Sequence, residues 1–116
     1  MALEDYHVEK LLKELVFNRR HLRTSIFFLC QTYISVPKDL RKLFSNLFIF
    51  RVNKNELKLI FEEQIEDKTK VNLISEITKL VFDRPFQFLF INTDTQRFFK
   101  NFDELLFKDD DDIMSA

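Results

Sequence analysis

Two polar features in the first part of the sequence have side chains that could act on a phosphate group. Residues 19–23 (RRHLR) form a basic cluster, and Gln31 directly follows the apolar run at residues 25–30. An arginine aimed at a phosphate stabilises the charge of a phosphoryl-transfer transition state. A polar residue at the carboxyl end of a buried strand lies where α/β sheets bind ligands. Simpler readings stay open: a solvated basic turn for the arginines, and a loop-capping amide for Gln31.

The histidines and the cysteine do not indicate a metal site. No Cys or second His lies at metal-ligand spacing from His21, and His7 lies on the far side of a predicted helix. Cys30 is the single Cys, so no disulfide can form within the chain, which favours a reducing compartment. We therefore expect no metal site and no disulfide.

The absence of Gly excludes one kind of site from these residues. The 116 residues contain no Gly at all. A Gly-rich phosphate loop needs backbone that approaches the phosphates without side chains in the way. We therefore expect this chain by itself to be unable to bind and hydrolyse a nucleotide as a P-loop enzyme.

The strands that would position these side chains are short and apolar. The continuous apolar run at residues 25–30 predicts a strand covered on both faces, as in a parallel sheet. Residues 47–52 predict a second strand of the same buried type. Residues 86–91 alternate and predict a third strand, and residues 96–99 predict an edge strand that returns after a turn as a hairpin.

Helices are predicted between these strands. Apolar residues at helical spacing indicate helices over residues 6–18, 37–46 and 55–66, and a longer one after Asp67 that ends before Pro85. A short helix is predicted near residues 103–107. In the helix at residues 6–18, Glu9 and Lys13 form a favourable i,i+4 pair. In the helix at residues 37–46, Arg41 is expected on the polar side.

Composition favours a globular α/β domain. The chain is 46% hydrophobic and 32% charged, and no apolar run approaches the ~20 residues of a membrane span. The N-terminus lacks the apolar core of a signal peptide. We predict one domain over residues 1–108 and an acidic disordered tail at residues 109–116. Residues 1–58 carry 11 Lys and Arg against 6 Asp and Glu, whereas residues 59–116 carry 7 against 13.

Two stretches resemble a family of viral motors. Residues 18–41 (NRRHLRTSIFFLCQTYISVPKDLR) are similar to a segment of the genome-packaging ATPases of large DNA viruses, the poxvirus-type branch of the FtsK–HerA class. In that family an Arg-His step precedes a strand that ends in Gln, and a Pro and an Arg follow on the next helix. Residues 85–106 (PFQFLFINTDTQRFFKNFDELL) resemble the family's C-terminal strand and turn. The resemblance spans about residues 11–106.

The resemblance implies roles for particular residues. Gln31 would be the sensor that orients water or reads the γ-phosphate, and Arg20 would be the arginine finger, with Arg19 as the alternative. Glu4 and Asp5 lie roughly where the family has its Walker B carboxylates, although the strand that should precede them is missing here. Arg41 would add a phosphate or inter-subunit contact.

The resemblance also implies a fold, cofactors and partners. The chain would be the C-terminal part of a P-loop ATPase core, with about 3–4 strands and without the phosphate-loop strand. ATP and Mg²⁺ would serve the complete motor, a ring that translocates double-stranded DNA into a capsid. Its partners would be a phosphate-loop-bearing part or like subunits, in the host cytoplasm (the virus factory) or the virion.

Two other functions remain open from the sequence. A non-enzymatic viral interaction protein derived from this fold would explain the absent Gly-rich loop. A nucleic-acid binder would rest only on the basic first half, because the aromatic residues are mostly Phe at core spacing and not a stacking platform.

Overall fold

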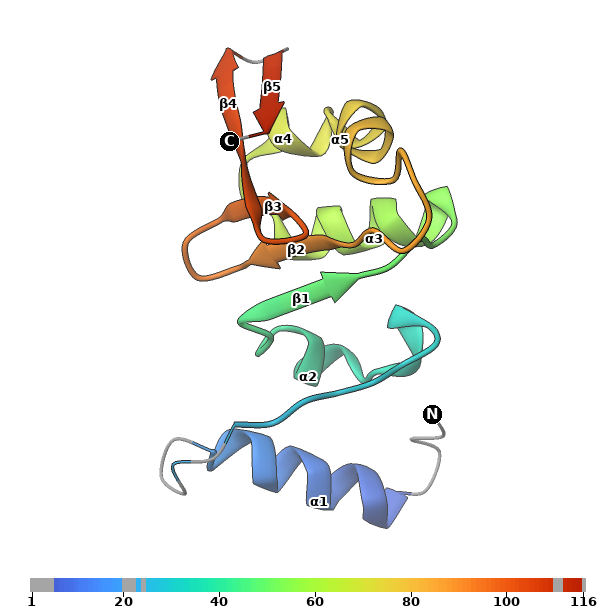
Figure 1. Cartoon of the computed structure of the whole chain (residues 1–116). Coiled ribbons are helices and arrows are strands. Elements are labelled where there is room, and N and C mark those ends of the chain that lie inside the picture. Colours follow the sequence, from blue (N-terminus) through green and yellow to red (C-terminus); the bar gives the residue numbers. More distant parts are fainter. Residues whose placement is uncertain (1–5, 20–22, 24, 110–111, 116) are drawn as a thin grey trace. The chain divides into compact units, whose positions relative to one another are not determined.

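The computed structural model describes residues 6–19, 23, 25–109 and 112–115. The chain forms two compact units, Met1–Leu43 and Phe44–Ala116, where the sequence predicts a single domain. Helices and strands are both present, so the predicted α/β class is confirmed. Each unit is described separately below, with the elements labelled as in Figure 1.

The first unit is helical. Helix α1 spans Tyr6–Phe17 and confirms the predicted N-terminal helix, and its Lys13 Nζ lies 3.2 Å from Glu9 Oε1. A single 3₁₀ turn, η1, covers Tyr33–Ser35, and helix α2 covers only Lys38–Arg41. The helix predicted over residues 37–46 is therefore much shorter. It ends because Leu43 N bonds to Leu40 O, three residues back, and the chain then enters the first strand.

The strand predicted at residues 25–30 is wrong. These residues form no regular secondary structure, and Phe27 and Leu29 are 83% and 89% exposed. Cys30, expected inside a buried strand, is exposed as well. An apolar run becomes a buried strand only where neighbouring strands offer hydrogen-bond partners. None of the described strands pairs with this segment.

The second unit contains a sheet with strand order β1-β2-β3-β4-β5. The strands are β1 Asn46–Ile49, β2 Leu89–Asn92, β3 Arg97–Lys100, β4 Asp103–Asp109 and β5 Asp112–Ser115. Every pairing is antiparallel, so the expectation of buried, parallel-type strands is wrong. The connections from β2 to β3 and from β3 to β4 are too short for a parallel crossover, which needs a dozen or more residues.

The predicted hairpin is confirmed. β2 and β3 pair from Leu89 opposite Lys100 to Asn92 opposite Arg97, one turn apart in the chain. In that turn Asn92 Oδ1 accepts a hydrogen bond from Thr95 N at 3.1 Å, as Asn does in tight turns. Gln96 closes the turn with a positive φ of 57°.

The C-terminal segment differs most from the prediction. The helix expected near residues 103–107 is wrong, because this stretch belongs to β4. Its side chains alternate, with Leu105 buried and Leu106 exposed, which is the period of a strand. Asn101, at φ 54°, makes the tight turn that sends the chain back along β3. Where an acidic tail was predicted, Asp112–Ser115 pairs with β4 as β5.

Three helices lie between β1 and β2 in the sequence. α3 spans Lys54–Gln64, and Asn53 caps it, with Oδ1 accepting from Glu56 N at 2.8 Å. The longer helix predicted after Asp67 is divided into α4, Lys68–Val71, and α5, Ile74–Val81. Asp67 caps α4 through Thr69 N at 2.9 Å. The division falls at Leu73, whose backbone leaves the helical region at ψ 14°.

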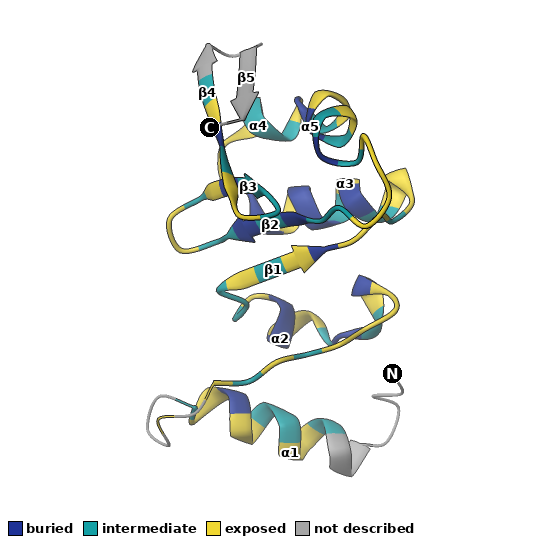
Figure 2. Cartoon of the chain, viewed as in Figure 1, coloured by how far each residue is buried: buried dark blue, intermediate teal, exposed yellow. Residues whose placement is uncertain are grey.

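The sheet is apolar on both faces. One face and the helices share the core of this unit, which includes Leu57, Ile60, Phe61, Ile77, Val81, Leu89, Ile91 and Phe98. Figure 2 shows this burial as dark blue on α3 and β2, while much of β1 is yellow. The alternate residues on the other face are phenylalanines, with Phe48 stacked on Phe90 at 4.5 Å and Phe90 on Phe99 at 5.0 Å.

Candidate functional site

The C-terminal end of α1 gives Arg19 a structural task. Its Nη1 donates to Val16 O at 2.8 Å, and its backbone N donates to the same carbonyl at 3.3 Å. Asn18 Nδ2 donates to Glu14 O at 2.8 Å in the same turn. The last carbonyls of a helix have no partner within the helix, so these side chains satisfy them. Arg19 is thus held against its own helix.

Several predicted site residues lie outside the described part of the chain. These are Glu4, Asp5, Arg20 and His21. Arg23, from the same basic cluster, is described and is exposed, with a positive φ of 52°. A non-Gly residue in this left-handed region is uncommon and marks a sharp turn. The backbone therefore bends sharply at Arg23.

Gln31 is exposed and follows the exposed apolar segment at residues 25–30. Within the described part of the chain its side chain makes no hydrogen bond, so it caps no loop there. Neither Arg19 nor Arg41 bonds to it. The structure therefore does not join the predicted sensor to either of these arginines.

Arg41 is buried, contrary to the expectation that it lies on the polar side of its helix. It is 9% exposed, and its guanidinium carbon lies 5.0 Å from the centre of the Tyr33 ring. The helix is a single turn, so Arg41 packs back against η1 instead of projecting from a long polar face. A guanidinium over an aromatic face is a stabilising cation–π contact.

An ion-pair cluster joins α1 to α2 within the first unit. Lys13 Nζ lies 2.9 Å from Asp39 Oδ2 and 3.2 Å from Glu9 Oε1. The hydrogen bonds that Lys13 donates to Asp39 and then to Glu9 raise the pKa of Lys13, and the bond from Lys13 lowers the pKa of Asp39. All three charges are solvated, so the cluster orients the two helices more than it stabilises them.

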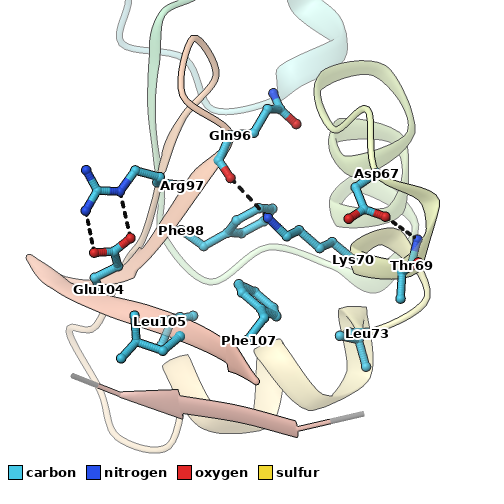
Figure 3. Close-up of a pocket in the computed structure, with 11 residues that line it drawn as sticks. Asp67, Thr69, Lys70, Leu73, Gln96, Arg97, Phe98, Glu104, Leu105 and Phe107 are labelled. Atoms are coloured by element: carbon cyan, nitrogen blue, oxygen red, sulfur yellow. Dashed lines mark hydrogen bonds and ion pairs between the residues drawn. The ribbon is translucent and has the colours of Figure 1, made fainter. Parts of the chain in front are cut away.

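The sequence reading missed a cavity in the second unit. It has a volume of about 360 Å³ and lies beside Lys70 of α4, where β3 and β4 separate (Figure 3). Lys70 Nζ donates to Gln96 O at 3.3 Å and lies 5.6 Å and 5.0 Å from the ring centres of Phe98 and Phe107. We call it the Lys70 cavity. No sequence signal indicates it, because its walls come from the α4 region and from β3 and β4, which lie more than 20 residues further along the chain.

An ion pair closes one side of the Lys70 cavity. Arg97 Nε and Nη2 donate to the two carboxylate oxygens of Glu104 at 2.7 and 2.5 Å, the two-pronged geometry that arginine favours. This pairing lowers the pKa of Glu104 and raises that of Arg97. Both charges are therefore already matched.

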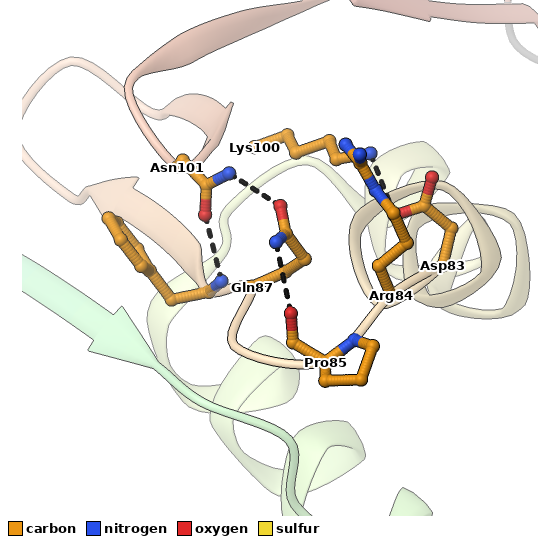
Figure 4. A network of polar contacts seen from close by, with 7 residues as sticks. Asp83, Arg84, Pro85, Gln87, Lys100 and Asn101 are labelled. Atoms are coloured by element: carbon orange, nitrogen blue, oxygen red, sulfur yellow. Dashed lines mark hydrogen bonds and ion pairs between the residues drawn. The ribbon is translucent and has the colours of Figure 1, made fainter.

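A polar network fixes the loop that precedes β2 (Figure 4). Asn101 Oδ1 accepts from Phe88 N at 3.0 Å, and its Nδ2 donates to Gln87 Oε1 at 2.7 Å. Gln87 Nε2 in turn donates to Pro85 O at 3.1 Å. Lys100 Nζ bonds to Asp83 Oδ1 at 2.9 Å, which lowers the pKa of Asp83. The loop is therefore fastened to the β3–β4 turn.

Two kinds of feature are absent from the described residues. In these ranges no group of three or more His, Cys, Asp or Glu side chains could hold a metal ion. No helix in the same part of the chain is long and apolar enough to cross a membrane.

Comparison with known proteins gives one match. The family model described as Poxvirus A32 protein matches residues 3–108, which is most of the chain. No curated protein and no solved structure matches the chain. The match includes both stretches that resemble poxvirus-type genome-packaging ATPases, and it confirms that resemblance. The chain therefore belongs to the Poxvirus A32 protein family, and it is related to the viral packaging ATPases.

Proposed function

We propose that this chain acts as part of a viral DNA-packaging ATPase of the FtsK–HerA class, with Gln31 as sensor and Arg20 as arginine finger. The family match over residues 3–108 carries this proposal. In the assembled motor the chain would work beside like subunits or a phosphate-loop-bearing part, on double-stranded DNA. The site of action would be the virus factory in the host cytoplasm, or the virion.

The contacts of Arg19 support Arg20 as the finger. A finger must leave its own subunit and reach a phosphate, and Arg19 is bonded to a carbonyl of its own helix. Arg20 is the next residue of the basic cluster and matches the Arg-His step of the family motif. Arg23 stands outside that motif, so it is the natural control.

The exposed segment at residues 25–30 supports a role in assembly. It is apolar and continuous, yet no described strand pairs with it. A strand-like segment with open backbone groups is a template for pairing with another chain. We propose that it enters a sheet when the phosphate-loop strand is present, which would place Gln31 at the carboxyl end of that strand.

The residues of this chain do not fit ATP and Mg²⁺ alone. There is no Gly for a phosphate loop, and the described residues hold no cluster of metal ligands. The nucleotide would therefore be held mainly by residues outside these 116, on the same polypeptide or on a partner. Glu4 and Asp5 would contribute from this chain, whereas the buried Arg41 packs on Tyr33.

The sensor role of Gln31 can be tested in the assembled motor. DNA-stimulated ATP turnover is measured for Gln31→Ala and for Thr32→Ala, whose exposed neighbouring side chain is the matched control. We expect turnover to fall by about 10²-fold or more with Gln31→Ala, as for loss of one preorganised polar contact, and to stay unchanged with Thr32→Ala. Equal turnover in both variants contradicts the sensor role.

A second candidate function is supported by the phenylalanine face of the sheet. The rings of Phe48, Phe88, Phe90 and Phe102 contact one another, and Phe48 and Phe102 remain exposed. Exposed contiguous apolar surface of this kind marks interaction sites. A non-enzymatic interaction protein would lose its partner with Phe48→Ser and Phe102→Ser, while Gln31→Ala and Arg20→Ala would change nothing.

A further inference from the structure

We propose that the Lys70 cavity binds a carboxylate that is attached to an apolar group. This inference concerns the second unit only and does not depend on the packaging function proposed above. It rests on the shape of the cavity, on the position of one ammonium group, and on the charges that line the walls.

The cavity forms because the β3–β4 hairpin opens. The two strands pair only at Phe99 opposite Glu104 and Lys100 opposite Asp103. Beyond that point β4 pairs with β5 instead, so Gln96 to Phe98 and Leu105 to Phe107 line the cavity without pairing across it. A volume of about 360 Å³ lies within the roughly 300–1,000 Å³ of small-molecule sites.

Among the described residues, no carboxylate forms an ion pair with the positive charge of Lys70. An ammonium has three hydrogen-bond donors, and in the described part of the chain Lys70 gives one of them to Gln96 O. The two carboxylates that line the cavity have other partners, because Glu104 accepts two hydrogen bonds from Arg97 and Asp67 accepts one from Thr69 N. Figure 3 shows Lys70 extending from the α4 side toward Gln96, with Phe98 and Phe107 beside its stem.

The other residues that line the cavity determine which kind of group the carboxylate can be attached to. Leu73, Leu105 and Phe98 are buried apolar side chains that line the cavity, so an apolar group would lose water there favourably. Asp67 and Glu104 are also part of the lining, and they repel a doubly charged anion more than a singly charged one. The site therefore fits a monocarboxylate with an aromatic or aliphatic body, and not a phosphate.

Such a carboxylate could belong to a free organic acid or to the C-terminus of a peptide. The free-acid arm of the test uses phenylpropionate, with phenylpropionamide as the neutral probe of the same shape. The peptide arm uses a short peptide that ends in Phe with a free carboxylate, compared with the same peptide as its amide. Binding is followed by amide chemical shifts of the whole chain in NMR titrations.

We expect the acids to shift the amides around Lys70, Gln96 and Phe107, and the amide probes to bind at least about tenfold more weakly, as for loss of a charge-assisted hydrogen bond. Lys70→Met keeps the apolar stem and should weaken the acids by a similar factor. Lys68→Met is the control on the same helix, because Lys68 is exposed and does not line the cavity.

Tighter binding of phenylpropionate would identify a free organic acid as the source of the carboxylate. Tighter binding of the peptide would identify a peptide C-terminus. If the wild-type chain binds the acids and their amides with equal affinity, the proposal is overturned. This comparison uses no variant, so it does not depend on whether a variant folds. Unchanged acid binding by a folded Lys70→Met variant overturns it as well, as does the absence of any shift around the cavity with both acids.

Discussion

Two arginines of the first unit, Arg19 and Arg41, have different surroundings. Arg19 lies against the last turn of its helix, where its guanidinium satisfies the Val16 carbonyl. The guanidinium of Arg41 is packed on a tyrosine ring. Arginine suits both tasks, because its planar group can bond in two directions and also stack on an aromatic face. The same residue type thus serves packing at two positions, and phosphate binding is proposed at a third, Arg20.

The finger assignment predicts a clear difference among three alanine variants. In a motor assembled with a phosphate-loop-bearing partner, Arg20→Ala should lower ATP turnover by roughly 10³-fold. Arg20→Lys should restore little, because a point charge does not reproduce the planar group. Arg19→Ala should mainly lower the free energy of unfolding, by about 1 kcal/mol for lost capping.

Arg23→Ala is the control for this experiment and should change neither turnover nor stability noticeably. ATP turnover is measured on the assembled motor, and stability by urea unfolding of the chain. Small and equal effects on turnover from all three alanine variants would remove the finger assignment and favour the interaction protein.

Asn101 predicts a stability effect that is independent of function. Asn101→Ala removes the acceptor of Phe88 N and the donor to Gln87, and it places a Cβ-bearing residue without local hydrogen bonds at φ 54°. We expect a loss of about 1–3 kcal/mol in urea unfolding. Asn101→Gly should lose less, because Gly accepts this φ.

Asn55→Ala, on the exposed side of α3, is the matched control for Asn101 and should stay within about 0.5 kcal/mol of wild type. If Asn101→Ala proves as mild as Asn55→Ala, then the network around the loop does not hold it in place.

At the scale of elements, the sequence correctly predicted a helix and a turn that depend on contacts between residues close together in the chain. The helix at residues 6–18 and the hairpin turn near Asn92 depend on residues a few positions apart, and both are confirmed. The prediction of a strand at residues 25–30 was wrong, because a strand needs neighbouring strands to pair with, and no local sequence pattern shows whether they are present. β4 was taken for a helix because a short apolar run does not distinguish the two periods.

The same limit applies to the candidate sites. The basic cluster and Gln31 are visible in the sequence because they are contiguous or lie next to an apolar run. The Lys70 cavity is not visible, because Lys70, Gln96 and Phe107 meet only after the sheet and helices pack. The burial of Arg41 was missed because its helix is one turn long, so its amphipathic pattern could not be read.

The exposed apolar segment predicts association through one element. The purified chain should self-associate or bind a phosphate-loop-bearing partner, because Phe27 and Leu29 are exposed and no described strand pairs with residues 25–30. The double variant Phe27→Ser and Leu29→Ser should weaken this association. Since both side chains are exposed, it should change the stability of the chain by only about 0.5 kcal/mol.

Sedimentation of both proteins measures this effect. A wild-type chain that stays monomeric at high concentration, and that does not bind the partner, would mean that the segment is not an assembly element.

At the scale of the whole molecule, carboxylates set the dependence of stability on pH. Hydrogen bonds from Lys13, Lys100 and Arg97 hold the pKa values of Asp39, Asp83 and Glu104, respectively, below their ordinary values. The unfolded chain therefore binds protons at these groups before the folded chain does. Their stabilisation is complete above the unfolded pKa of about 4 and is lost as pH falls through the lower folded values.

Thermal unfolding should therefore show a Tm that decreases as pH is lowered below about 5. Lys100→Met removes the partner of Asp83 and should make this decrease shallower, whereas Lys79→Met, at an exposed position of α5, should leave it unchanged. Identical pH profiles for the two variants would show that the Asp83 pair contributes nothing to acid stability.

The absence of Gly bears on the activity of the chain as a whole. A phosphate loop holds ATP through successive backbone N–H groups that only a Gly-rich segment can present, and these 116 residues contain no Gly. We therefore expect the purified chain to show no ATP turnover, and millimolar Mg-ATP should not raise its Tm, because a ligand raises Tm only when it binds the folded state. Addition of a phosphate-loop-bearing partner should produce turnover that depends on Arg20 and Gln31. ATP turnover by the pure chain, abolished by Gln31→Ala but not by Thr32→Ala, would contradict this expectation and place a complete catalytic site within these residues.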